Sequence, residues 1–226
     1  SKIYISNGQI CDLILSSAGA PVAVRGLSSR TIILEKDILG FTRERMKKLG
    51  HHSAATAQLY FDDCRVPVEN LIGEEGSGFK YMMEALNPAR ISHSARSVGQ
   101  AQAAFDASLN FAKERKQFGQ PIGKFQAISF KLAQMAIEIE AARALVYEVA
   151  SLFDQGNECR KEAPMTKAFS SDVAIRVAEE AMRIHAGSGY LANSVIQRYF
   201  CDSILYHTTE GTTEIQELII SRELGL

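Results

Sequence analysis

The chain has 226 residues, a formal net charge of −1 and a sequence pI of about 6.5. It carries no basic excess for nucleic acid or an anionic membrane surface, and no apolar run of the roughly 20 residues that a membrane-spanning helix needs. Because 46% of the residues are hydrophobic, one large domain or two small ones can form.

Its first residues, SKIYISNG, form a strand pattern rather than a signal peptide. The four cysteines, Cys11, Cys64, Cys159 and Cys201, show neither a CxxC pair nor the spacing of metal ligands. We therefore expect reduced thiols in an intracellular protein, with no disulfide framework and no metal site.

The first 70 residues predict β-structure, because short β-branched and aromatic runs alternate with turn residues. The expected strands cover 2–5, 12–17, 31–36 and 58–66, the last ending before Pro67. Residues 68–78 predict a loop.

From residue 78 onward the sequence predicts helices. The first long helix should be kinked or broken early by Pro88. The expected helices cover 78–116, 127–154, 163–186, 194–207 and 213–224, with a loop at 117–126. This predicts an α+β fold, mostly α: part of a β-domain at 1–72, then an antiparallel bundle of long helices at 73–226.

Residues 127–154 form the most apolar of these helices, and the apolar positions cover more than one face. Such a helix is typical of a surface that contacts another subunit, although a crowded core within one chain would give the same pattern.

The stretch 207–224 holds one carboxylate, Glu210, beside Gly211 and just ahead of an apolar-periodic run. Thr213 and Gln216 have the spacing of a capping box, which predicts a helix start near Thr213. A carboxylate on the turn before a helix can reach into a pocket as a general base. By itself the pattern also fits a solvated turn residue.

Three segments together resemble the acyl-CoA dehydrogenase flavoprotein family: ERKQFGQPIGKFQA at 114–127, RIHAGSGY at 183–190 and TEGTTEIQ at 209–216. Residues 4–8 (YISNG) and 61–79 are similar to that family's middle β-domain. Family members normally carry a helical domain and the first half of the β-domain ahead of YISNG. The resemblance thus implies the C-terminal part of such a protein, whether a processed fragment, a split subunit or an expressed piece.

The resemblance implies FAD-dependent α,β-dehydrogenation of an acyl-CoA thioester, with Glu210 as the base for the α-proton. The backbone N–H of Glu210 and a flavin ribityl hydroxyl would bind the thioester carbonyl. Some family members place the base on the first long helix before an arginine. Here that position is Ala89, which cannot act as a base, followed by Arg90.

Several residues match cofactor positions of the family. A guanidinium such as that of Arg115 suits a pyrophosphate, although a cation ending a helix would look the same. Ala186 stands where the family often has a first of two glycines. The resemblance implies that a neighbouring subunit's FAD contacts Arg115, Phe118, Gln126, Arg183, Ile184, His185, Ala186 and Gly187.

The resemblance also implies that Thr212 and Glu214 lie on the adenine side of FAD, and that Tyr4, Ile5 and Ser6 cover the isoalloxazine ring. An ordinary strand would explain residues 4–6 as well. The implied substrate-binding residues are Asn87, Arg90 and Gly211, although Arg90 alone could be a surface arginine. His51 and His52 receive no role.

The implied partners are the acyl-CoA substrate, an electron-transferring flavoprotein and further copies of the chain in a homotetramer, a dimer of dimers. The bacterial cytoplasm and the mitochondrial matrix fit equally. Two alternatives remain open: an oxidase, decarboxylating or reductase variant of the fold, or a non-catalytic helical fragment that oligomerises without flavin.

Overall fold

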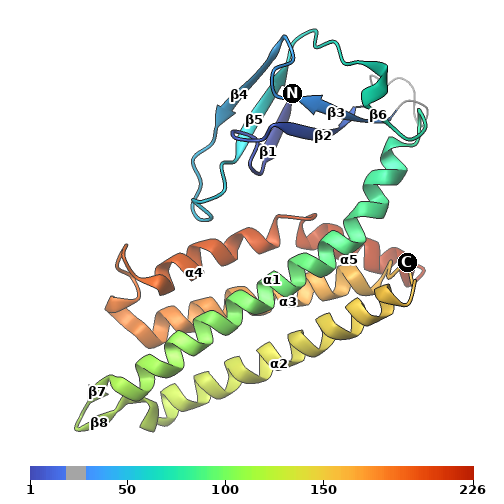
Figure 1. Cartoon of the computed structure of the whole chain (residues 1–226). Coiled ribbons are helices and arrows are strands. Elements are labelled where there is room, and N and C mark those ends of the chain that lie inside the picture. The colour runs from blue at the N-terminus through green and yellow to red at the C-terminus, as the bar shows by residue number, and fades with distance from the viewer. Residues whose placement is uncertain (19–28) are drawn as a thin grey trace. The chain divides into compact units, whose positions relative to one another are not determined.

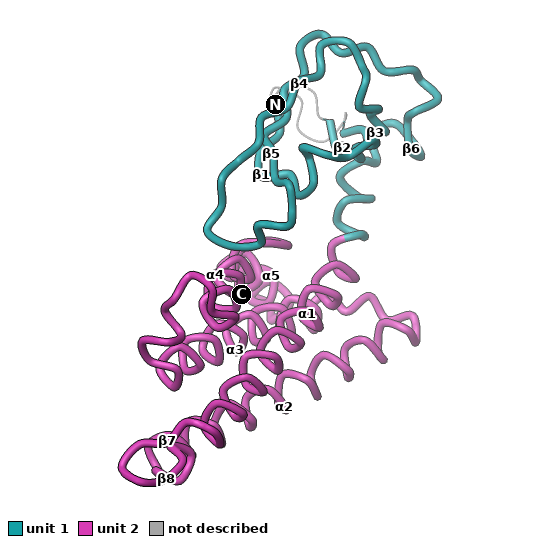
Figure 2. The backbone as a smooth tube through the Cα atoms, turned by 60° about the vertical axis from the view of Figure 1, so that its left-hand side comes forward, with its two compact units in different colours: residues 1–85 teal, residues 86–226 magenta. Residues whose placement is uncertain are grey.

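The structure, a computed structural model, describes residues 1–18 and 29–226. It divides into two compact units, Ser1–Ala85 and Leu86–Leu226 (Figure 2). The dividing point lies inside helix α1 (Gly78–Glu114), whereas the predicted domain boundary falls between residues 72 and 73. The α+β, mostly α fold class is confirmed (Figure 1).

The first unit contains two three-stranded antiparallel sheets, ordered β1-β5-β4 and β2-β3-β6. Their strands are β1 (Lys2–Ile5), β2 (Leu13–Ala18), β3 (Arg30–Glu35), β4 (Phe41–Arg45), β5 (Ala57–Phe61) and β6 (Leu71–Ile72). Strands from both sheets contribute to one apolar cluster, built on Ile14, Leu34, Ala57 and Leu59.

The sequence did not predict β4 or β6, and it made β5 too long. β4 ends in three consecutive charged residues, Arg43 to Arg45, and most of the strand is exposed. It therefore lacks the alternating apolar pattern that predicts a strand. β5 ends at Phe61, and soon after it Asp63 adopts a left-handed φ of 46°, which takes the chain out of the extended conformation.

The second unit is a helical bundle in which α3 packs against α2, α4 and α5. Besides α1 its helices are α2 (Gln126–Asp154), α3 (Glu162–His185), α4 (Val195–Ser203) and α5 (Thr213–Glu223), with the 3₁₀ turns η2 (Ile122–Lys124), η3 (Ala186–Ser188) and η4 (Ile204–His207). A small hairpin, β7 (Lys116–Gln117) with β8 (Gln120–Pro121), lies in the predicted loop. A further 3₁₀ turn, η1 (Val68–Asn70), belongs to the first unit.

Helix α1 continues through Pro88 instead of breaking there. A proline removes one backbone hydrogen bond. The apolar face that follows it, including Ile91 and Val98, is buried, and this packing favours continuation of the helix.

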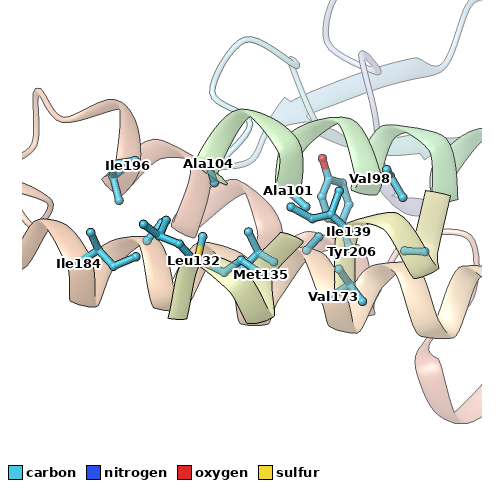
Figure 3. Close-up of a cluster of buried hydrophobic side chains, with 14 of the residues drawn as sticks. Val98, Ala101, Ala104, Leu132, Met135, Ile139, Val173, Ile184, Ile196 and Tyr206 are labelled. Atoms are coloured by element: carbon cyan, nitrogen blue, oxygen red, sulfur yellow. The ribbon is translucent and has the colours of Figure 1, made fainter. Parts of the chain in front are cut away.

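The bundle core brings together side chains from four helices and from Tyr206 (Figure 3). Alanines on α1 let it approach its neighbours closely, while larger side chains on α2 and α3 fill the space. The labelled members are Val98, Ala101, Ala104, Leu132, Met135, Ile139, Val173, Ile184, Ile196 and Tyr206.

Apolar side chains also remain on the outside of α2. Phe130, Ile137 and Tyr147 are 64%, 63% and 69% exposed. The described part of the chain therefore leaves one apolar face of this helix without a partner.

All four cysteines are free thiols. Across residues 1–18 and 29–226, no group of histidine, cysteine and acidic side chains could hold a metal ion. Over the same residues, no helix combines the length and the hydropathy needed to cross a bilayer.

Candidate active site

Glu210 lies on a turn between η4 and α5 and is half-buried. It has a left-handed backbone, with φ of 55°, and Gly211 follows with φ of 89°. A non-glycine residue with positive φ is uncommon, and such residues concentrate at functional sites. The turn aims the Glu210 side chain differently from a residue inside a regular helix.

Helix α5 begins at Thr213 as predicted, but the capping residue is Thr212. The Thr212 hydroxyl accepts from the N–H of Ile215 at 3.4 Å. The Thr213 hydroxyl is buried without a hydrogen-bond partner. The capping-box assignment of Thr213 and Gln216 is therefore wrong by one residue, because Gln216 is drawn to other acceptors.

Gln216 is fully buried, and its side-chain amide donates toward three successive backbone carbonyls of the turn. The distances from Nε2 are 3.1 Å to Glu210, 2.9 Å to Gly211 and 3.3 Å to Thr212. Its Oε1 atom is buried and has no partner. One side chain thus holds the carbonyls of three consecutive residues, beginning with Glu210.

Lys167, on α3, is also fully buried. Its Nζ donates to the Gly211 carbonyl at 2.8 Å and, at 3.5 Å, toward that of His207. Burial and the nearby Arg90 cation lower the pKa of Lys167 to about 8, against the opposing effect of Glu210. The same turn is therefore held from α3 by an ammonium group.

Arg90 is only 5% exposed, which excludes the alternative of a surface arginine. It donates to the Asn87 side-chain carbonyl at 2.9 Å, and Asn87 donates to the Glu158 carbonyl at 2.9 Å. Burial lowers the pKa of Arg90, and the charge of Glu210 opposes that shift. The Nε of Arg90 is buried without a partner, so this cation has an unused donor.

Two more polar contacts hold the approach to Glu210. Thr209 lies 3.3 Å from the Nδ1 of His93, a buried residue on α1. The Nε2 of His207 lies 2.7 Å from Asp172 of α3. The carboxylate of Glu214 is exposed, and its own backbone N–H and the Thr212 hydroxyl lower its pKa.

The β7–β8 hairpin presents another group of predicted residues. Phe118 and Gly119 form its tip with φ of 51° and 81°, and Phe118 is 92% exposed. Arg115 and Gln126 flank the hairpin and are exposed. Among the described residues the Arg115 guanidinium forms no ion pair or hydrogen bond, so it is free to bind an anion.

The turn after α3 carries the remaining group, Arg183 to Gly187. Arg183 pairs with Glu179 at 2.5 Å and Glu180 at 3.2 Å, so its charge is already balanced. Ile184 belongs to the buried core. His185 stacks on Phe111 of α1 at 4.2 Å, and burial lowers its pKa.

Ala186 has φ of 49° and ψ of −133°, a combination that glycine adopts far more readily. Gly187 is exposed, with open space where a side chain would be. The backbone at Gly187 is thus accessible to a ligand, and the Ala186 methyl group carries a conformational cost.

These predicted residues fall into two clusters on the bundle. The His185–Phe111 contact places the 183–187 turn beside the end of α1 that leads into the hairpin. Lys167 and Arg183 are 16 positions apart on α3, which corresponds to about 24 Å along a helix. The Glu210 cluster and the Arg115 cluster therefore lie near opposite ends of α3.

In the first unit, Tyr4 lies at a β-bulge. Lys2 pairs with Leu59 and Ile5 with Ala57, so β1 holds one extra residue. Tyr4 has φ of 61° and is 71% exposed. Ile5 packs against the apolar cluster of this unit, and Ser6 is exposed.

Sequence reasoning missed Lys167. A signal was present, because the buried residues of α3 recur at helical spacing through Ala163, Lys167, Ser170 and Ala174. A lysine within such a stripe must be buried, and a buried lysine needs acceptors.

The fold and this cluster define the class of protein: a helical bundle that presents a half-buried carboxylate on a strained, doubly anchored turn. The family model described as acyl-CoA dehydrogenase, C-terminal domain, matches residues 76–225. The chain belongs to the acyl-CoA dehydrogenase family.

Individual relatives agree. An acyl-CoA dehydrogenase of Bacillus subtilis is 44% identical over 99% of this chain and 59% of its own length. The butyryl-CoA dehydrogenase structure from Megasphaera elsdenii has a TM-score of 0.95 and 39% identity, covering 100% of this chain and 59% of that one.

A structure described as the electron transferring flavoprotein of Acidaminococcus fermentans, with flavin-based electron bifurcation as its subject, also matches. Its TM-score is 0.95 at 41% identity, over 99% of this chain and 59% of that one. The chain thus spans about three fifths of the length of each of these proteins.

Proposed function

We propose that this chain carries the catalytic base and part of the FAD site of an acyl-CoA dehydrogenase, which converts an acyl-CoA thioester to the trans-2-enoyl-CoA. The observation that carries the proposal is Glu210: a half-buried carboxylate in a left-handed backbone, beside the buried Arg90 cation, in a member of this family.

Glu210 takes the α-proton of the thioester in this mechanism. The α-carbon is a weak acid, so the site must stabilise negative charge on the thioester carbonyl as the proton leaves. Among the described residues, the N–H of Glu210 donates no backbone hydrogen bond, so it is available to that carbonyl. FAD, when bound, supplies the acceptor for the β-hydrogen as hydride at N5.

Arg90 and Asn87 support the substrate in the same cluster. The unpartnered Nε of Arg90 is a buried donor that a ligand acceptor can satisfy. Gly211 keeps the backbone beside Glu210 free of a side chain, which allows the thioester to come close. Both features fit a site completed by a ligand.

The residues present fit FAD at several points. The unpaired Arg115 suits a pyrophosphate, the exposed Phe118 offers an apolar surface, and Gln126 adds an exposed amide. At the turn after α3, the accessible backbone from His185 to Gly187 is the better candidate, because the Arg183 side chain is paired. The Thr212 hydroxyl is also engaged, by Ile215 and Glu214.

Residues 4–6 are the last group that we propose to contact the cofactor. The exposed Tyr4 would lie beside the flavin ring, and the Ser6 hydroxyl would form a hydrogen bond to it. The positive φ shared by Tyr4, Phe118, Ala186 and Glu210 supports ligand contacts at these positions.

The separation of the two clusters along α3 supports a site that a second copy of the chain completes. We propose that one copy's Glu210 cluster and another's Arg115 cluster serve one FAD, within a homotetramer. The exposed Phe130, Ile137 and Tyr147 on α2 support burial against a further copy. We propose an electron-transferring flavoprotein as the electron acceptor, in line with the description of one related structure.

The test is Glu210→Gln in the intact protein, with Glu217→Gln, an exposed residue on α5, as the matched control. FAD content and native mass should match the unmodified protein. Flavin bleaching by butyryl-CoA, or by longer and branched acyl-CoA thioesters, should slow at least about a hundredfold. Undiminished bleaching would remove Glu210 from the role of base.

The same protein preparations distinguish a dehydrogenase from the alternative functions. An oxidase would transfer electrons from the reduced flavin to oxygen rather than to an electron-transferring flavoprotein. A non-catalytic helical assembly would be colourless and still oligomeric.

A further inference from the structure

Lys167 is a buried cation that neither the sequence motifs nor the proposed reaction accounts for. It is fully buried on α3, where charged side chains are rare unless paired. Among the described residues no carboxylate lies within 4 Å of its Nζ; its hydrogen-bond acceptors are the carbonyls of Gly211 and His207. Burial disfavours the charged form of a lysine, so a buried lysine without a carboxylate partner is uncommon.

The acceptors of Lys167 belong to the turn that carries Glu210. The Gly211 carbonyl receives the Lys167 ammonium at 2.8 Å from α3 and the Gln216 amide at 2.9 Å from α5. Gln216 also donates to the Glu210 carbonyl, so side chains hold both peptides that follow Glu210. The second of them, Gly211–Thr212, is held from two helices. This fixation offsets the strain of consecutive left-handed residues.

The charges around Lys167 come from every element that packs on it. Glu210 on the turn, Asp172 on α3 and Glu214 on α5 favour the ammonium form, and Arg90 on α1 opposes it. His207 contributes its carbonyl, and its ring is paired with Asp172. Among the described residues, Lys167 and Arg90 are therefore the two buried cations that interact with Glu210.

We propose that Lys167 is a positioning residue for Glu210: with Gln216 it fixes the backbone of the turn that carries the carboxylate. The proposal rests on the assignment of Glu210 as the base. Lys167 holds the turn from α3 and Gln216 holds it from α5, so loss of either side chain is expected to displace the carboxylate from the reacting carbon.

The experiment compares Lys167→Gln and Lys167→Met with Lys131→Met and Gln216→Leu in the intact protein. Lys131 is the matched control, since it lies on α2 and pairs with Glu180, away from the turn. The glutamine variant keeps an amide donor while losing the charge. The measurement is the limiting rate of flavin reduction and the half-saturating concentration of butyryl-CoA, with FAD content and native mass recorded for each variant.

Lys167→Met should lower the limiting rate of flavin reduction about tenfold, because a small displacement of a catalytic group slows the chemical step. The half-saturating concentration of butyryl-CoA should change by less than about twofold, since Lys167 holds the turn and not the substrate. Lys167→Gln, whose amide lies one bond closer to the main chain, should lower the limiting rate about threefold. Lys131→Met should leave both values unchanged, and Gln216→Leu should lower the limiting rate because it releases the same carbonyl. If Lys167→Met does not fold, the limiting rate of Lys167→Gln decides.

A limiting rate in Lys167→Gln equal to that of the unmodified protein would overturn the proposal. Failure of this proposal can be told apart from failure of the proposed function. Normal bleaching by Glu210→Gln overturns the base, and with it this proposal. Loss of bleaching in Glu210→Gln together with an unchanged limiting rate in Lys167→Gln overturns only the role of Lys167.

Discussion

Lys167 and Gln216 share one acceptor: the carbonyl oxygen of Gly211 lies 2.8 Å from the lysine Nζ and 2.9 Å from the glutamine Nε2. Both side chains are fully buried, and they come from different helices, α3 and α5. A carbonyl has two lone pairs, so it can accept both bonds at once. The peptide next to Glu210 is therefore anchored before any ligand binds.

The buried ammonium predicts a pH dependence of stability. The pKa of Lys167 is about 8 in the folded chain, against 10.5 as its ordinary value, so between these pH values the unfolded state binds a proton that the folded state lacks. The free energy of unfolding should rise across this window, by up to about 3 kcal/mol, and remain at its lower value below pH 8.

Urea unfolding of the intact protein and of Lys167→Met from pH 7 to about 10.5 measures this contribution as a difference curve, with Lys131→Met as the parallel comparison. A difference between Lys167→Met and the unmodified protein that does not change with pH would show that the lysine titrates normally.

Gly211→Ala should destabilise the protein and slow the reaction. The backbone φ is 89°, and an added Cβ would lie 2.7 Å from the Gln216 Nε2, so the amide must leave its carbonyl acceptors. We expect a loss of about 2–3 kcal/mol, from the left-handed backbone and the broken hydrogen bonds together.

Gly156→Ala is the matched control, because Gly156 has the same φ of 89° and open space around an added Cβ. Its free energy of unfolding should fall only by the cost of placing an alanine in a left-handed backbone. Equal losses for the two variants would mean that the Gln216 contact contributes nothing.

Ala186→Gly should stabilise the protein, in contrast to most alanine-to-glycine changes. Relief of the φ 49°, ψ −133° backbone outweighs the added flexibility of the unfolded chain, for a net gain of roughly 1 kcal/mol. Ala95→Gly, at an exposed position within α1, should instead cost about 1 kcal/mol. Unfolding midpoints of the two variants should therefore shift in opposite directions.

Arg115→Ala should weaken FAD binding while leaving the fold intact. The guanidinium is exposed and makes no described ion pair, so its removal should change the free energy of unfolding by no more than about 0.5 kcal/mol. The apparent Kd for FAD should rise at least about tenfold with the loss of a charge-assisted contact.

Lys116→Ala removes an exposed cation one residue away and should leave FAD affinity unchanged. Titration of the apoprotein with FAD, followed by flavin fluorescence, gives both constants. Equal effects of the two substitutions would indicate general electrostatic attraction rather than a contact made by Arg115.

Local sequence patterns were enough to predict the fold class and the order of the helices. Apolar spacing gave the long helices, and the start of α5 at Thr213 followed from the threonines ahead of an apolar run. Local patterns also marked Glu210 as a carboxylate on a turn. These features depend on neighbours within a few residues, which the chain order already contains.

The neighbours of that carboxylate, in contrast, depend on how the helices pack against one another. Thr212 caps α5 instead of Thr213 because the Gln216 side chain turns back to the carbonyls of the preceding turn. Lys167 reaches Gly211 across 44 positions of sequence, and Arg90 is buried rather than on the surface. Contacts between helices fix these arrangements, and single-helix periodicity carries no information about which neighbour a buried side chain will meet.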